Sequence, residues 1–79
     1  MNFLKHDERE KLMRLVNELF EPSNRYSEHT SYHIKHILER ITGFYMSNDE
    51  MKSIMIELGY YPNSKTERNP RYKVKFKKL

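Results

Sequence analysis

The chain has 79 residues, which is enough for one domain built around one small core. Charged residues make up 33% of it, and its six tyrosines and four phenylalanines argue against a disordered chain. The absence of cysteine excludes disulfides and thiolate metal sites. No apolar run approaches the roughly 18 residues that span a bilayer, and residues 1–10 lack the apolar segment of a signal peptide. We therefore expect a single cytoplasmic domain, residues 1–79, with no membrane partner.

The net charge of +4 is unevenly distributed along the chain. Residues 65–79 hold seven basic side chains and one acidic side chain, a net charge of +6, so residues 1–64 carry −2. The basic character therefore belongs to the C-terminal end of the protein.

A first helix is predicted over about residues 8–21. Asp7 and Glu10 have the spacing of a capping box, and Pro22 is incompatible with a continuing helix. Between them, apolar residues recur at intervals of three and four, the pattern of one helix face. These residues are Leu12, Leu15, Val16, Leu19 and Phe20.

Two further helices are predicted over about residues 29–42 and 48–58. Each has an apolar residue every third or fourth position, and each is followed by a glycine, Gly43 or Gly59, which favours a helix end. The candidate N-caps are Ser27, Thr30 and Ser31 for the second helix and Ser47 and Asn48 for the third.

The C-terminal part has the period of a β-strand. Tyr72, Val74 and Phe76 alternate with basic residues, after a polar loop and a possible strand start at residues 60–62. We therefore predict a hairpin over about residues 60–77, with residues 44–46 as a small third strand or an extended linker. Three helices followed by a hairpin with a basic tip indicate an α+β, mostly helical, winged-helix-like domain.

The basic face of the last strand is the strongest functional signal. Its side chains should repeat every 6.6–7 Å or so, which suits contacts with successive phosphates of a nucleic acid. The predicted phosphate contacts are Lys65, Arg68, Arg71, Lys73, Lys75 and Lys77. Two alternatives remain: an edge strand that lysines protect from aggregation, and a surface for an acidic protein partner.

The third helix is poorly suited to approach phosphates. Its exposed positions include three acids, Asp49, Glu50 and Glu57, against one lysine, Lys52. The possible base-reading residues are Ser47, Asn48 and Lys52. We expect the hairpin to dominate, and binding to depend weakly on base sequence, because phosphate contacts carry little sequence information.

Three histidines, His29, His33 and His36, fall on one face of the predicted second helix together with Arg40. Histidines at this spacing can chelate zinc or nickel, but no fourth ligand is evident and Arg40 would repel a cation. A polar surface face is the simpler interpretation. A third interpretation is a binding surface that strengthens below about pH 6.5.

The tyrosines can either stack on the bases of single-stranded nucleic acid or pack in the core, and packing in the core is the simpler expectation for each. With two glycines and no cysteine, the chain has neither a phosphate-cradling glycine loop nor a thiol nucleophile, and it has no nucleophile elbow. We expect a protein that is not an enzyme, with no catalytic residues and no cofactor.

A set of spaced residues resembles small proteins and domains of Gram-positive phages and related mobile elements. The set comprises Ser31-Tyr32-His33-Ile34-Lys35-His36, Glu39, Gly43, Tyr45, Ser47-Asn48, Lys52, Met55 and Gly59-Tyr60. The resemblance covers about half of the chain. It implies a compact helical domain with a C-terminal hairpin that acts in a bacterial host cell.

The sequence thus leads to two main hypotheses, given that short accessory proteins of this kind usually bind DNA or redirect a host protein. The first is a DNA-binding accessory protein that uses the basic hairpin. The alternative is a protein-binding module that inhibits host replication, transcription or CRISPR machinery, with edge pairing to a partner sheet as one mode. A homodimer that forms its site across the interface is a third possibility.

Overall fold

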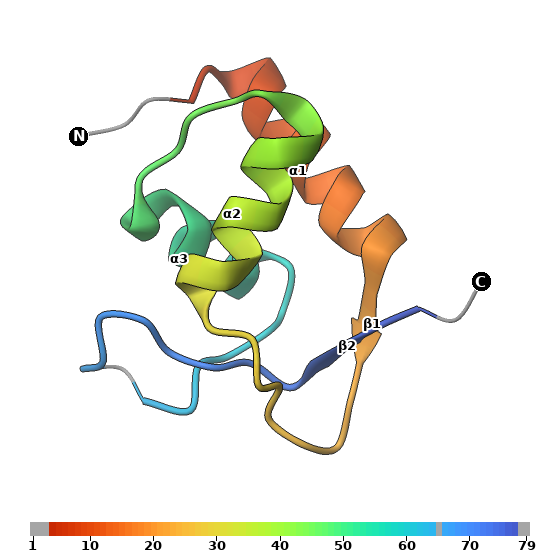
Figure 1. Cartoon of the computed structure of the whole chain (residues 1–79), viewed down its shortest axis with the longest axis vertical. Helices are drawn as coiled ribbons and strands as arrows, with labels where there is room; N and C mark the ends of the chain where they lie inside the picture. The colour runs from red at the N-terminus through yellow and green to blue at the C-terminus, as the bar shows by residue number, and fades with distance from the viewer. Residues whose placement is uncertain (1–3, 65, 78–79) are drawn as a thin grey trace.

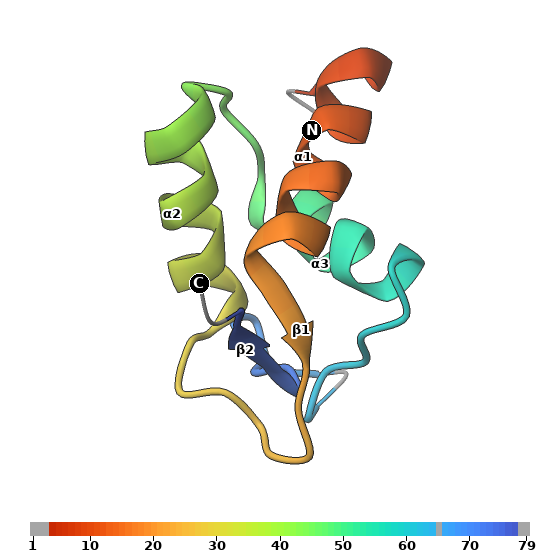
Figure 2. The same ribbon diagram turned by 90° about the vertical axis from the view of Figure 1, so that its right-hand side faces the viewer.

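The computed structural model describes residues 4–64 and 66–77. Three helices, α1 (His6–Leu19), α2 (Ser31–Thr42) and α3 (Asn48–Glu57), accompany two short strands, β1 (Phe20–Pro22) and β2 (Val74–Phe76). Figures 1 and 2 show the helices above and the paired strands below, with residues 70–77 crossing the base of the molecule. The fold is α+β, as the sequence predicts, and it is about half helical, less than the mostly helical domain that was expected.

The helix α3 matches its predicted range to within one residue, and α2 ends where predicted but begins at Ser31, two residues after the predicted start. The Thr30 side chain accepts a hydrogen bond from the backbone N–H of His33, and Gly43 ends α2 in the left-handed conformation with φ of 75°. At the start of α3, Ser47 and Glu50 form a reciprocal capping box with distances of 3.1 and 2.8 Å.

The boundaries of α1 differ from the prediction at both ends. The helix begins at His6, where Glu8 accepts a hydrogen bond from the backbone N–H of Lys5, so the predicted box of Asp7 and Glu10 is wrong. It ends at Leu19 because Phe20 adopts an extended conformation and enters β1. Phe20 fits the apolar spacing of the helix, so spacing alone extended the predicted helix too far.

The C-terminal strand has a different partner from the predicted one. We expected residues 60–62 to pair with it, but β2 pairs antiparallel with β1, in the register Phe20 with Phe76 and Pro22 with Val74. The rings of Phe20 and Phe76 lie 4.6 Å apart, and this contact favours the pairing. On the other side, a single bridge joins Pro62 to Tyr72.

Residues 70–77, which we call the C-terminal segment, are hydrogen-bonded along their length. Backbone N–H groups of Ser23, Ser27 and Ser31 donate to carbonyls of this segment at 3.0, 2.7 and 2.9 Å. On the opposite side, the backbone N–H of Asn63 donates to the carbonyl of Arg71 at 2.9 Å. The segment is therefore held between the β1–α2 loop and the loop that follows α3.

The core lies between the helices and the C-terminal segment. Its buried apolar side chains are Leu12, Val16, Phe20, Ile34, Leu38, Met46, Met51, Ile54, Met55, Tyr72 and Val74. Residues 44–46 form an extended linker that places Met46 in this core, and not a third strand. None of the helices within residues 4–64 and 66–77 is long and apolar enough to cross a membrane.

Candidate nucleic-acid interface

The alternation of the C-terminal segment separates its basic residues from the core. Tyr72 and Val74 are buried, whereas Arg71, Lys73 and Lys75 are exposed, as is Lys77 beyond them. The sequence prediction of one buried and one basic face is therefore confirmed for these residues, with Phe76 as an exception at 43% exposure. Arg68 is exposed in the preceding loop, and Lys65 lies outside the described residues.

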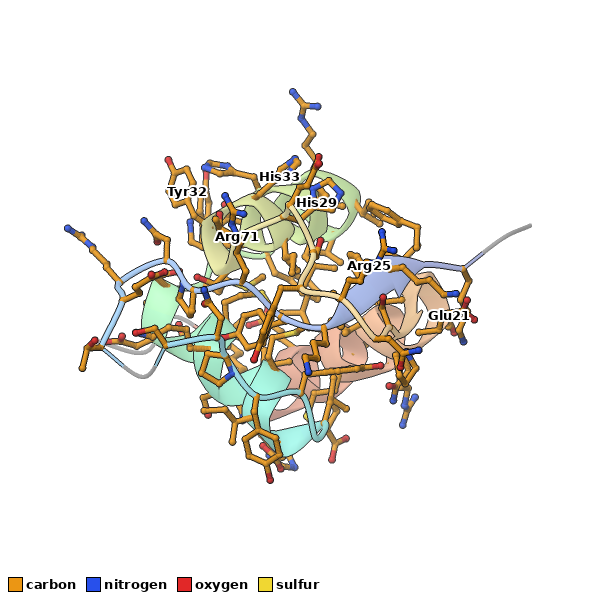
Figure 3. All side chains as sticks on the ribbon, turned by 90° about the horizontal axis from the view of Figure 1, so that it is seen from below. Glu21, Arg25, His29, Tyr32, His33 and Arg71 are labelled. Carbon is orange, nitrogen blue, oxygen red and sulfur yellow. The ribbon has the colours of Figure 1, made fainter. Side chains whose placement is uncertain are left out.

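Arg71 lies at the start of α2. Its backbone bridges to that of Thr30, the N-cap of α2. Figure 3 shows its side chain on the lower face of the molecule, in the same region as Tyr32 and His33. No acidic group among the described residues is within ion-pair distance of Arg71.

Lys73 lies beside the β1–α2 loop. Its ammonium nitrogen is 5.1 Å from the centre of the Tyr26 ring, and its carbonyl accepts a hydrogen bond from the backbone N–H of Ser23. The same loop carries Arg25, which is exposed on the lower face in Figure 3. Sequence reasoning missed Arg25, because only the pairing of the two segments brings it near the basic strand.

Lys75 is partly neutralised. It is opposite Glu21 in the β1–β2 register, and its ammonium nitrogen lies 3.5 Å from a carboxylate oxygen of Glu21. Both side chains are well exposed, so this ion pair contributes little to stability. Its electrostatic effect is local, since it cancels one positive charge in the middle of the strip. We call Arg25, Arg68, Arg71, Lys73, Lys75 and Lys77 the basic strip.

Asn48 does not have a free side chain with which to read bases. Its amide nitrogen donates to the carbonyl of Arg68 at 2.6 Å and to Oδ1 of Asn69 at 3.0 Å, and its own Oδ1 accepts from Ser31 at 3.0 Å. It joins the first turns of α2 and α3 to the loop before the C-terminal segment. These contacts give Asn48 a structural role, and its contact with nucleic acid stays a prediction.

Lys52, the other predicted contact on α3, has little freedom. Its ammonium nitrogen lies 3.7 Å from Asp49, and its side chain is 27% exposed. Nearby, Arg9 of α1 binds both Glu57 and Ser53. The exposed face of α3 carries Asp49 and Glu57 and contacts α1, whereas Glu50, which was expected to be exposed, is buried.

His29, His33 and His36, the weak candidates for a metal site, do not converge on one point. His29 precedes α2, and its Nδ1 lies 2.7 Å from Nδ1 of His33. His36 instead packs edge-on against Tyr32 and lies 3.8 Å from Glu39. Within the described part of the chain, no three His, Asp or Glu side chains are placed to hold a metal ion.

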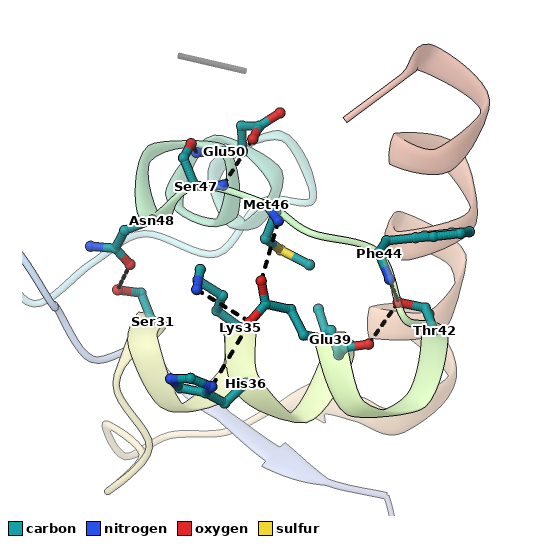
Figure 4. A network of polar contacts seen from close by, with 11 residues as sticks. Ser31, Lys35, His36, Glu39, Thr42, Phe44, Met46, Ser47, Asn48 and Glu50 are labelled. Atoms are coloured by element: carbon teal, nitrogen blue, oxygen red, sulfur yellow. Dashed lines mark hydrogen bonds and ion pairs between the residues drawn. The ribbon is translucent and has the colours of Figure 1, made fainter. Parts of the chain in front are cut away.

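Polar residues of α2, the linker after it and the start of α3 form a hydrogen-bonded network (Figure 4). Glu39 accepts from Lys35 at 3.2 Å and from the backbone N–H of Met46 at 3.3 Å, so it fixes the linker to α2. The Ser31–Asn48 hydrogen bond and the Ser47 cap complete the network. These polar side chains therefore hold α2, the linker and the start of α3 together.

The tyrosines divide into two groups. Tyr72 is fully buried, and burial raises the pKa of its hydroxyl to about 12. Burial, with a smaller contribution from Glu21, also raises the pKa of Tyr60. The exposed tyrosines are Tyr26, Tyr32, Tyr45 and Tyr61.

No family model matches the chain, and no match was found among curated proteins or solved structures.

Proposed function

We propose that this protein is a non-enzymatic accessory protein of a phage or mobile element that binds nucleic acid through the basic strip. The observation that carries the proposal is the exposed row of Arg71, Lys73, Lys75 and Lys77 on a hydrogen-bonded backbone. That backbone is held along one side by β1 and the β1–α2 loop, and at its start also by residues 62–63. A fixed backbone holds these charges in a line before the ligand arrives, which lowers the entropic cost of binding.

Phosphates are the best-fitting partners of this row. Alternate residues of an extended segment repeat every 6.6–7 Å or so, close to the spacing of phosphates along one strand. Arg25 and Arg68 extend the positive surface beyond the row. Because such contacts read charge and not bases, binding should vary little with base sequence.

A reduced winged helix is the architecture that we propose for this binding. In a winged helix, a strand after the first helix joins the two strands of the wing in one sheet. The order α1–β1–α2–α3, then the Pro62–Tyr72 bridge and β2, supports this arrangement. The described residues between Pro62 and Tyr72 would then be the wing, and the acidic α3 would not serve as the recognition helix.

The salt dependence of binding tests the proposal. In a fluorescence-anisotropy titration, log Kd should rise linearly with log salt concentration. Replacing Lys73 or Arg71 by Gln should reduce the slope by about 1 each, whereas Lys75→Gln should reduce it less, because Glu21 already neutralises Lys75. Lys11→Gln, on the exposed face of α1, is the matched control. Salt-independent binding would refute the phosphate mechanism.

A second candidate function, binding to a host protein, is favoured by one feature. A hollow of about 300 Å³ is lined mainly by apolar side chains, among them Ile56, Tyr61, Pro62 and Pro70. Such a hollow can receive an apolar anchor of a partner. A partner that survives nuclease treatment of a host lysate, and is lost with Ile56→Lys but not with Lys73→Gln, would support this function over the first.

A further inference from the structure

A second hollow adjoins the basic strip. It has a volume of about 410 Å³ and lies between the β1–α2 loop, the end of α3 and the C-terminal segment. Its lining includes Pro22, Tyr26, Tyr60, Tyr61 and Lys73. This volume is within the range of roughly 300–1,000 Å³ that small-molecule sites occupy. We call it the tyrosine hollow.

Two aromatic rings of this hollow are open to solvent. Tyr61 is 69% exposed and Tyr26 is 48% exposed, whereas Tyr72, on the same C-terminal segment as Lys73, is fully buried. Exposed aromatic side chains that gather in a concave site are typical of binding surfaces. A positive charge is part of the same site, because the Lys73 ammonium lies 5.1 Å from the centre of the Tyr26 ring.

We propose that unpaired nucleobases stack in the tyrosine hollow, so that the ligand of the basic strip is single-stranded nucleic acid. This inference rests on the proposed function and specifies its substrate class. Aromatic rings beside lysines are the arrangement by which proteins hold single strands, with stacking on the bases and charge on the phosphates. A duplex keeps both faces of each base covered, so it can contact only the charges.

Charge complementarity supports this occupant. Lys73 of the C-terminal segment lines the hollow on one side, and Arg25 lies on the loop that carries Tyr26. Neither cation has an acidic partner among the described residues. A strand laid along Arg71 and Lys73 would therefore bring a base to Tyr26 and Tyr61 while its phosphates meet unpaired positive charges.

The test compares three probes that carry the same number of phosphates: a thymidine oligonucleotide, its abasic analogue and a duplex. Tyr61→Ala should weaken binding of the thymidine strand about tenfold and change duplex binding little. Tyr61→Phe, which keeps the ring, should retain the affinity. Tyr45→Ala is the matched control, because Tyr45 is exposed on the linker between α2 and α3. Circular dichroism should show that each variant is folded.

The outcomes separate this inference from the proposed function. If the wild type prefers the thymidine strand over the abasic one, and Tyr61→Ala removes that preference, the stacking role is supported. If all three probes bind equally and Tyr61→Ala changes nothing, the inference is overturned while phosphate binding stands. If no probe binds even at low salt, the proposed function itself fails.

Discussion

At the scale of single residues, two polar side chains differ in how well their hydrogen-bonding groups are satisfied. Tyr72 is buried, and its hydroxyl has no hydrogen-bond partner among the described residues. Asn48 is the opposite case, since its amide makes three hydrogen bonds to residues from other elements. A buried hydroxyl without a partner costs stability, whereas a side chain that joins three segments provides it.

Tyr72→Phe should stabilise the protein. The substitution removes the unpaired hydroxyl and keeps the ring that fills the core, so we expect a gain of about 1 kcal/mol in the free energy of unfolding. Urea unfolding followed by circular dichroism at pH 7 measures it. A loss of 1 kcal/mol or more would mean that the hydroxyl has a partner in solution.

The same residue should make the protein sensitive to alkali. The pKa of Tyr72 is about 12 in the folded state and near 10 when the chain is unfolded, so the folded state favours the neutral hydroxyl. This contribution is fully present below pH 10 and is lost as the pH rises from 10 to 12. Urea unfolding across this range should show a smaller decline for Tyr72→Phe than for wild type. Equal declines would contradict the assignment.

Asn48→Ala should destabilise the protein without a specific effect on binding. Loss of the three hydrogen bonds should lower the free energy of unfolding by about 1–3 kcal/mol. Asn17→Ala, an exposed change on α1, should have a small effect and serves as the control. If Asn48→Ala leaves thermal stability unchanged but weakens DNA binding, Asn48 is a contact residue after all.

At the scale of elements, the helices could be predicted from the sequence and the strand pairing could not. Helix-capping residues such as Ser47 and Gly43 interact with residues a few positions away, so the ends of a helix can be predicted from the local sequence. β1 has three residues, and Phe20 satisfies helical spacing as well as strand pairing. The choice of partner depends on the contact between Phe20 and Phe76, 56 positions apart in the chain, which no local pattern indicates.

For the candidate site, the exposure of the basic residues could be predicted from the sequence, but their neighbours in the fold could not. The period of two along residues 71–77 correctly placed Arg71, Lys73 and Lys75 on the exposed side. The neighbours of these residues were not predictable, because Arg25 and Glu21 come next to them only through the pairing with β1. The hydrogen bond from Asn48 to the carbonyl of Arg68 could not be predicted either, because the two residues are 20 positions apart in the chain and meet only in the folded structure.

The pairing of Lys75 with Glu21 leads to a prediction at this scale. Glu21→Gln should free Lys75 and strengthen nucleic-acid binding at low salt by roughly twofold to fivefold, the equivalent of one surface ion pair. Glu18→Gln makes the same change in charge on the exposed face of α1 and should have less effect. Equal gains from both variants would mean that net charge, and not Lys75, governs affinity.

At the scale of the whole molecule, basic and acidic side chains are unevenly distributed over the surface. Arg71, Lys73 and Lys77 of the C-terminal segment and Arg25 of the loop beside it have no acidic partner among the described residues, whereas Lys75 pairs with Glu21. The exposed face of α3 carries Asp49 and Glu57. The basic strip and the tyrosine hollow share Lys73, so one ligand can occupy both. This asymmetry predicts that a nucleic acid approaches from the base of the molecule in Figure 1 and leaves the far side of α1 free.

Mapping the interface by NMR tests this account most directly. ¹⁵N-labelled protein would be titrated with a short thymidine oligonucleotide at low salt, and amide shifts followed for every residue. If the basic strip and the tyrosine hollow bind the strand, the largest changes fall at residues 25–26, 60–61 and 68–77 and disappear as salt is raised, while residues 8–18 of α1 change little. Changes centred on α3 and α1, or none at all, would contradict the claim that the basic strip is the binding surface.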